Sequence, residues 1–439
     1  MMSPDFLIQN VSVIPMPGHR VLQGYDVCIE GSKITRISPS KRQKVLSGHK
    51  LIDGSGKFLM PGLFDMHVHL YSQSFFPLFL MNGVTAIREM GNTQESIFQL
   101  REGVNTGKVL GPRMFVCGPI LEGNPPLWKG FRVIRSKKEA KNAVKELKQK
   151  GADFIKVYHT LKPEIYKIIL SEAHLRGLKV TGHLPKSIDI LEGLSLGQDG
   201  FEHMYDFVEH VVEISSIDAH LKTRPGWRKF TNVKINKQKL QKLSTILKKN
   251  RYVSFCPTLV VDEKMGELSN YKKLEKVKET KYLSKRYTEV IWNPEHPKSA
   301  ENVRDLPSLY FKNIKTLYAQ TRHILPSLTG NGNLLAGSDT PNPFVIPGFS
   351  LIEELELLVS SGLKPYQALE AATYNAAQWL NVQSELGTIE EGKTANLVLL
   401  RKSPLESISH IRSLEAVTLN GKYFSLKSLK ARARQRGGL

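Results

Sequence analysis

The sequence has few cysteines and no long hydrophobic run, and both absences restrict the class of protein. Only three cysteines occur in 439 residues, at Cys28, Cys117 and Cys256, and none belongs to a Cys-X-X-Cys pair. A disulfide framework of the kind that stabilises small secreted domains is therefore not expected. No apolar run approaches the roughly 20 residues that a membrane-spanning helix needs, so no transmembrane segment is expected. The first residues lack the basic and apolar regions of a signal peptide, which favours a cytoplasmic protein.

Acidic residues are missing from two basic stretches. The formal net charge is +21, and residues 220–255 and the tail 425–439 contribute to it without a single Asp or Glu. Such stretches can contact anionic lipid, nucleic acid or an acidic partner, although a solvated basic face and a frayed tail explain them more simply. We therefore expect a small-molecule substrate and no obligatory nucleic-acid partner. The sequence is compatible with a homo-oligomer.

Both ends of the chain have the pattern of short β-strands. Residues 26–38 alternate apolar and polar side chains around Gly31, and residues 415–424 surround the turn pair Asn420-Gly421. Each pattern predicts a β-hairpin. We predict that residues 1–57 and 381–424 pair into one small β-sandwich, followed by a basic tail over residues 425–439.

The middle of the chain alternates short apolar runs with helical patterns. Eight apolar runs occur between residues 58 and 380. Two of the helices between them have clear boundaries, because Ser136 and Glu139 stand at capping-box spacing and Pro163 opens a helix that stops at Gly177. Eight strand–helix units predict a (β/α)8 TIM barrel, although a doubly wound sheet also alternates in this way. The longer connections at 207–250 and 262–328 predict additional helices.

Polar side chains stand at the ends of five of these predicted strands. In a (β/α)8 barrel the active site is built at the C-terminal ends of the strands. The groups found there are His67, His69, Lys156, His183, His203 and Asp339. Neutral imidazoles and carboxylates are ligands for divalent metal ions, so this set predicts metal binding.

The first two histidines are separated by one residue, as "HVH". This spacing places His67 and His69 on one face of a strand, where they can hold one ion with an oxygen of Asp339. His183 and His203 either complete this site or hold a second ion.

Lys156 is the unusual member of the set. A lysine in an apolar strand normally extends toward solvent, and a protonated ammonium has no lone pair for a metal ion. A buried, neutral amine can instead react with carbon dioxide to give a carbamate, whose two oxygens can bridge two metal ions. The local sequence leaves both interpretations open.

The whole pattern resembles the amidohydrolase superfamily. The resemblance runs through "MPGLFDMHVHL", "GADFIKVY", "KVTGHLP", "GFEHMY" and the segment from "LLAGSDT" to "YNAAQWL", which match landmarks of the family in order. Within the superfamily the pattern is similar to the branch of imidazolonepropionase-like proteins and prolidase-like dipeptidases, and Lys156 favours the prolidase-like side. The chain departs from the family pattern at Glu89 and Asn396, where Asp is usual. Neither position belongs to the predicted ligand set.

The resemblance implies a distorted barrel with a centre for two divalent metal ions. One ion would be held by the histidine pair of the first strand together with Asp339, and the other by His183 and His203. Carboxylated Lys156 would bridge the two ions. Zinc suits these ligands best, while manganese, iron and cobalt stay open. A hydroxide bridging the ions would attack the substrate carbonyl, with Asp339 as the catalytic base and acid.

These expectations describe a metal-dependent hydrolase that cleaves the amide or peptide bond of a small substrate, such as an N-acyl amino acid or a dipeptide with a C-terminal cationic or proline residue. A lactone, ester or phosphoester hydrolase is the alternative on the same site, and a catalytically silent basic binding protein is the alternative from another class. Four side chains on the loops after the strands are candidates for substrate binding, with ordinary loop packing as the competing explanation: Trp128, Tyr158, His159 and Tyr205.

Overall fold

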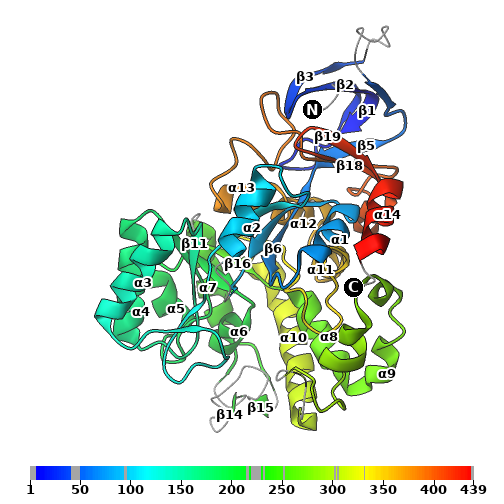
Figure 1. The fold of residues 1–439 in the computed structure, drawn as a ribbon. Helices are drawn as coiled ribbons and strands as arrows, with labels where there is room; N and C mark the ends of the chain where they lie inside the picture. The colour runs from blue at the N-terminus through cyan, green and yellow to red at the C-terminus, as the bar shows by residue number, and fades with distance from the viewer. Residues whose placement is uncertain are drawn as a thin grey trace.

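A computed structural model describes residues 6–40, 50–92, 96–213, 217–218, 229–230, 233–250, 253–300, 303, 306–330 and 332–436. The chain has an α/β fold in which one sheet, built from both chain ends, lies against a larger part made of short strands and helices (Figure 1). Among the helices that the structure describes, none is long and apolar enough to cross a membrane.

The sheet from the chain ends contains eight strands. These are β1 (Phe6–Val13), β2 (Leu22–Glu30), β3 (Lys33–Pro39), β4 (Lys50–Asp53), β5 (Phe58–Pro61), β17 (Leu397–Leu400), β18 (Leu414–Leu419) and β19 (Lys422–Ser425). Their order is β19-β18-β17-β5-β1-β2-β3, with β4 beside β1. β1 runs parallel to β4 and β5, and the other neighbours are antiparallel, so the sheet is mixed.

The two predicted hairpins are both present in this sheet. Glu30 pairs with Lys33 across the turn at Gly31, and Leu419 pairs with Lys422 across Asn420-Gly421. Both residues of the second turn have positive φ, as a two-residue turn of this type requires. The prediction that the two chain ends form one sheet is therefore confirmed.

Short parallel strands form the centre of the larger part. They are β6 (Leu63–Val68), β7 (Val84–Glu89), β8 (Arg113–Val116), β9 (Leu121–Glu122), β10 (Arg132–Val133), β11 (Phe154–Val157), β12 (Lys179–Gly182), β13 (Gly200–Glu202) and β16 (Ser254–Cys256). β6, β7 and β8 are neighbours, as are β10, β9, β11 and β12, and β13 pairs with β16. Seven of the eight predicted strand segments thus contain a strand.

The eighth predicted strand is an exception. Residues 333–340 are extended but form only isolated bridges, Leu334 with Phe255 of β16 and Thr340 with Val68 of β6. The backbone turns to φ +60° at Asp339, which interrupts regular pairing. Main-chain hydrogen bonds nevertheless join this segment to β16 on one side and to β6 on the other.

Helices occupy the connections between the strands. They are α1 (Phe76–Met81), α2 (Ser96–Asn105), α3 (Lys137–Gln149), α4 (Pro163–Leu175), α5 (Ile190–Ser195), α6 (Tyr205–Val211), α7 (Lys237–Lys249), α8 (Leu259–Glu267), α9 (Tyr271–Leu274), α10 (Ser308–Leu328), α11 (Phe349–Ser360), α12 (Pro365–Ala371) and α13 (Tyr374–Trp379). Short 3₁₀ turns span Gln73–Phe75, Leu268–Asn270, Lys278–Tyr282 and Ile408–Ser413, and a π-helical turn spans Tyr287–Ile291. Ser136 caps α3 and Pro163 opens α4, as predicted. The additional helices expected in the two long connections are present.

The structure describes one of the two basic stretches only in part and the other almost completely. Much of residues 220–255 lies outside the described residues, apart from β15 (Lys229–Phe230), which pairs with β14 (Ile217–Asp218), and α7. The tail is not frayed as expected, because α14 (Leu426–Arg436) lies against α1 (Figure 1). Leu429 and Ala433 are buried on one side of α14, while Lys430 and Arg432 are exposed. This apolar stripe explains why a strongly basic segment is ordered.

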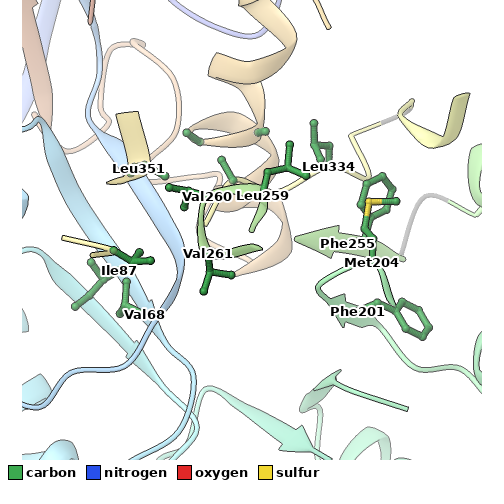
Figure 2. Packing of buried hydrophobic residues seen from close by; sticks show 14 of the residues in the cluster. Val68, Ile87, Phe201, Met204, Phe255, Leu259, Val260, Val261, Leu334 and Leu351 are labelled. Atoms are coloured by element: carbon green, nitrogen blue, oxygen red, sulfur yellow. The ribbon is translucent and has the colours of Figure 1, made fainter. Parts of the chain in front are cut away.

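Apolar side chains from strands and helices fill the centre of the larger part (Figure 2). Val260 and Val261 at the start of α8 belong to the same buried cluster as Val68 of β6 and Ile87 of β7. This packing fixes the first turn of α8 beside the strands that carry the candidate ligands.

Candidate metal centre

The structure brings the six predicted ligands together from five separate segments. They are His67 in β6 and His69 just after it, Lys156 in β11, His183 after β12, His203 after β13, and Asp339 in residues 333–340. Five of them are buried, and His69 is half-buried. Parallel strands carry their C-terminal ends to the same edge, which explains why residues so distant in sequence meet here.

Asp339 is the point at which the first group of side chains converges. Oδ1 of Asp339 lies 3.4 Å from Nε2 of His67 and 3.4 Å from Nε2 of His69. Oδ2 lies 3.8 Å from Nε2 of His203. Oδ1 is buried and accepts no hydrogen bond from the residues that the structure describes.

These separations fit a metal ion better than a hydrogen-bond network. The ligand atoms of His67, His203 and Asp339 all lie within 4.8 Å of one another. They are too far apart for good hydrogen bonds but close enough to share one ion. Two imidazoles and a carboxylate form a donor set that divalent transition metals accept. The cluster is therefore a buried His–Asp site that can hold a metal ion.

His183 and Lys156 complete the surroundings of this cluster. The rings of His183 and His203 are stacked with centroids 5.0 Å apart, and those of His67 and His203 lie 5.1 Å apart. Nζ of Lys156 lies 3.4 Å from Nε2 of His67. Lys156 is only 2% exposed, so the sequence-based alternative in which it extends to solvent is excluded.

Burial keeps the histidines of the cluster neutral. Burial, followed by the positive charge of Lys156, lowers the pKa of His69 to about 3. Burial also lowers the pKa of the other three histidines well below the ordinary value, and Lys156 contributes to each of these shifts. Burial lowers the pKa of Lys156 itself and raises the pKa of Asp339 to about 8. Neutral imidazoles retain the lone pair that a metal ion needs.

A buried carboxylate orients the first histidine. Nδ1 of His67 lies 2.8 Å from Oε2 of Glu202 and donates to it, so Nε2 of His67 is free to face Asp339. Glu202 also accepts hydrogen bonds from Nη2 of Arg88 at 2.7 Å and from Oγ1 of Thr181 at 2.6 Å. Arg88 is thus an internal ion-pair partner of Glu202. Because Glu202 is fully engaged, its proximity to Cys256 does not make a separate metal site.

Three residues in and beside this cluster have an unusual backbone conformation. His203, Thr258 and Asp339 all adopt positive φ, at 62°, 48° and 60°. The left-handed region is costly for a β-branched residue such as Thr258 and is most often retained at functional sites. Oγ1 of Thr258 lies 2.5 Å from Nδ1 of His203, so the strained residue holds this ring in place.

Several supporting residues were missed by sequence reasoning. Asp65 received no role, but its carboxylate accepts hydrogen bonds from N–H and O–H of Ser338, at 2.9 and 2.6 Å, and joins β6 to residues 333–340. Glu202 and Thr258 received no role. The available signal was a charged residue inside an apolar strand, as Glu202 is in "GFEHMY".

Three of the four predicted substrate-binding residues have rings in contact with histidines of the cluster. The ring of Tyr158 lies 4.4 Å from the ring of His183, and that of His159 lies 4.5 Å from it. Tyr205 is stacked on His203 at 5.2 Å. Trp128 is half-buried on the segment after β9. Tyr71, which sequence reasoning did not select, is 69% exposed two residues after His69.

The fold and the site define an α/β protein whose parallel strands carry a buried metal-binding cluster. Residues 58–424 match the model of the amidohydrolase family, and the chain belongs to this family. The family predicted from the sequence is confirmed.

Similar curated proteins cover only part of the chain. Adenine deaminase 2 of Bradyrhizobium sp. (strain ORS 278) is 29% identical over 104 residues, which are 21% of this chain and 17% of that protein. The dihydroorotase of Pyrococcus furiosus is 31% identical over 129 residues, 26% of this chain and 30% of that protein. The alignments thus span less than a third of the length of these relatives.

Solved structures share the fold over nearly the whole chain. A putative prolidase from Bifidobacterium longum has a TM-score of 0.67 with 22% identity and covers 99% of this chain and 100% of that one. A Xaa-Pro dipeptidase with bound methionine has a TM-score of 0.69 with 19% identity, at 96% and 100% coverage. A bottromycin amidohydrolase has a TM-score of 0.75 with 19% identity, at 99% and 91% coverage. At these identities the likeness shows the fold alone.

Proposed function

We propose that this chain is a binuclear metal hydrolase that cleaves the amide or peptide bond of a small substrate, such as a dipeptide or an N-acyl amino acid. The observation that carries the proposal is the convergence of Nε2 of His67 and Nε2 of His69 on the unpaired Oδ1 of Asp339, each at 3.4 Å. Family membership and the shared fold of a putative prolidase and a Xaa-Pro dipeptidase support a peptide-like substrate.

The architecture proposed for this function is a distorted (β/α)8 barrel over residues 58–380. Support comes from residues 333–340, whose hydrogen bonds to both β16 and β6 join the last segment to the first strand. We further propose that residues 1–57 and 381–424 form the attached β-sandwich, with the basic tail at 425–439 ending the chain.

The proposed metal centre uses all six clustered residues. One divalent ion would be held by the first-strand histidines with Asp339 and the other by His183 and His203, with carboxylated Lys156 as a further ligand. Zinc is the metal proposed. When bound, the ions supply Lewis acidity, which lowers the pKa of a water molecule and polarises the scissile carbonyl. The burial and lowered pKa of Lys156 support the carbamate, because carbon dioxide reacts only with the neutral amine.

The side chains of this chain perform the remaining steps. Asp339 accepts the proton of the attacking water and transfers it to the leaving nitrogen, and its Oδ1 has no hydrogen bond with any described residue to break beforehand. Glu202 and Thr258 keep His67 and His203 oriented throughout. The apolar surroundings exclude bulk water from the reacting groups.

Metal analysis combined with a substrate screen tests the proposal. The protein is loaded with zinc in bicarbonate buffer, and its metal content is measured beside that of Lys156→Met. The same preparations and Asp339→Asn are then assayed on dipeptides, N-acyl amino acids, lactones and phosphoesters. We expect close to two ions per chain, fewer in Lys156→Met, and amide hydrolysis that Asp339→Asn loses. Less than one ion per chain would refute the binuclear centre. Cleavage of lactones or phosphoesters alone would refute the amide substrate and favour an ester or phosphoester hydrolase.

A further inference from the structure

Asp262, in the first turn of α8, has a buried carboxylate that the proposed reaction does not use. The residue is 2% exposed. Its Oδ1 accepts a hydrogen bond from the hydroxyl of Tyr205 at 2.7 Å. Its Oδ2 is buried and has no hydrogen-bond partner, and no ion pair reaches Asp262, within the described part of the chain. Among the described residues, this side chain therefore lacks the cation that usually accompanies a buried carboxylate.

The carboxylate lies beside the candidate metal centre rather than in a remote part of the core. The ring of Tyr205, which contacts Asp262 through its hydroxyl, is stacked on His203 at an interplanar angle of 9°. The charge of Asp262 also raises the pKa of Asp339, so the two carboxylates are within electrostatic reach of each other. A group bound at Oδ2 of Asp262 would consequently lie near the reacting bond.

Two other buried carboxylates, Glu202 and Glu354, have structural roles that can be compared with the surroundings of Asp262. Glu202 is paired with the guanidinium of Arg88 at 2.7 Å. Glu354 of α11 accepts the N–H of Val260 at 2.8 Å through Oε2 and so satisfies the start of α8, while its Oε1 has no hydrogen-bond partner among the described residues. In the part of the chain that the structure describes, Asp262 has one neutral hydroxyl as its partner, which offsets little of the cost of burying a charge. Burial raises the pKa of Asp262 to about 7, and its place in the first turn of α8 lets the helix dipole act in the opposite direction.

We infer that Asp262 binds a cationic group of the substrate, an ammonium or a guanidinium, and thereby selects cationic substrates for the proposed hydrolase. The inference rests on the proposed function, because it names the substrate class of that site. Two sources supply such a group: the free α-ammonium of a dipeptide, or the side chain of a Lys or Arg residue next to the scissile bond.

Matched substrate pairs separate the two sources. Alanyl-alanine is compared with propionyl-alanine, which lacks only the α-ammonium, and alanyl-lysine with alanyl-norleucine, which lacks only the side-chain cation. We expect the wild type to prefer the cationic member of at least one pair by about 30-fold in kcat/KM. Asp262→Asn keeps an oxygen to accept from Tyr205 but removes the charge. It should lose about 10-fold or more on the cationic member and less than about 3-fold on the neutral one.

Two controls complete the kinetic experiment. Glu267→Gln, at the far end of the same helix, should leave both preferences unchanged. Equal losses on cationic and neutral substrates in Asp262→Asn would show that Asp262 only supports Tyr205 and would overturn the inference. A wild type that treats both members of each pair alike would overturn it as well.

Equilibrium binding keeps the inference testable if no substrate is cleaved. Calorimetry on the zinc-loaded protein compares L-lysine with L-norleucine, and alaninamide with propionamide. Tighter binding of one amine that Asp262→Asn abolishes would support the cation site even without hydrolysis, in which case only the proposed function fails. Equal binding within both pairs would refute the cation site whatever the hydrolytic activity.

Discussion

Nδ1 of His67 and Oε2 of Glu202 are joined by a hydrogen bond of 2.8 Å in which neither residue is exposed to solvent. The bond fixes the ring so that Nε2 is the atom available to a metal ion. Outer partners of this kind typically change metal affinity by about 10- to 100-fold. We predict a loss of that size for Glu202→Gln, measured by competition with a chelator.

The control for this variant is Glu385→Gln, which removes a carboxylate from a surface ion pair with Arg113. It should leave the metal affinity within error of the wild type. If Glu202→Gln bound metal as tightly as the wild type, the bond to His67 would have no part in tuning the ligand.

Arg88 supplies the buried cation that Glu202 requires. Its Nε donates to the main-chain oxygen of Met66 at 2.6 Å, and its guanidinium lies 4.5 Å from the ring centroid of Trp379. Arg88→Met should lower the free energy of unfolding of the metal-free protein by about 3–5 kcal/mol, because the carboxylate stays buried without a partner. Urea denaturation followed by circular dichroism measures this change.

An exposed ion pair provides the comparison for Arg88. Arg113→Met breaks the contact with Glu385, in which both side chains are partly exposed, and should cost less than about 1 kcal/mol. Similar losses in the two variants would show that burial of the Arg88–Glu202 pair does not increase its contribution to the free energy of unfolding.

The parts of the fold that depend on local chemistry could be predicted from the sequence. The turn at Asn420-Gly421, the Ser136 cap and the proline at Pro163 each act within a few residues, and each appears as predicted. Residues 333–340 were predicted as a regular strand, but they form only isolated bridges. The interruption at Asp339 depends on a strained backbone in the site, which the local sequence does not indicate. The tail was expected to fray, although Leu429 and Ala433 stand four residues apart as one face of a helix requires.

The same distinction between local patterns and long-range contacts applies to the candidate site. The clustering of the six polar residues followed from their common position at strand ends, whereas their roles as ligands stay predictions. Glu202 could not be assigned, because its partners Arg88, Thr181 and His67 come from three other strands and become neighbours only in the fold. Asp262 could not be assigned either, since the one partner it has among the described residues is Tyr205, far away in sequence.

Gly337 packs tightly against His67 of β6 and Cys256 of β16. A Cβ at this position would lie 2.6 Å from Sγ of Cys256 and 2.6 Å from the main-chain N of His67. Gly337→Ala should therefore push residues 333–340 away from β6, lower the free energy of unfolding by about 1–3 kcal/mol and weaken metal binding. Thermal unfolding and chelator competition check the two effects. Gly103→Ala in α2, where the nearest atom is 3.3 Å away, should change stability by about 1 kcal/mol or less. Equal effects of the two alanines would contradict the steric argument.

His174 and Asp199 form an ion pair away from the candidate centre, with Nε2 and Oδ2 2.9 Å apart. The hydrogen bond to Asp199 raises the pKa of His174 above its ordinary value. A raised pKa in the folded state means that the folded protein binds this proton more tightly than the unfolded chain does. The resulting stabilisation is complete below the ordinary histidine pKa and is lost as the pH rises through the raised value.

The stability difference between the wild type and His174→Gln should accordingly be larger at pH 5.5 than at pH 8.5. Both side chains of this pair are partly exposed, so the effect should be a small shift in the midpoint of thermal unfolding. The buried histidines of the metal centre titrate equally in both proteins and cancel from the difference. A difference that grew with pH would show that His174 is held in its neutral form, contrary to the contact with Asp199.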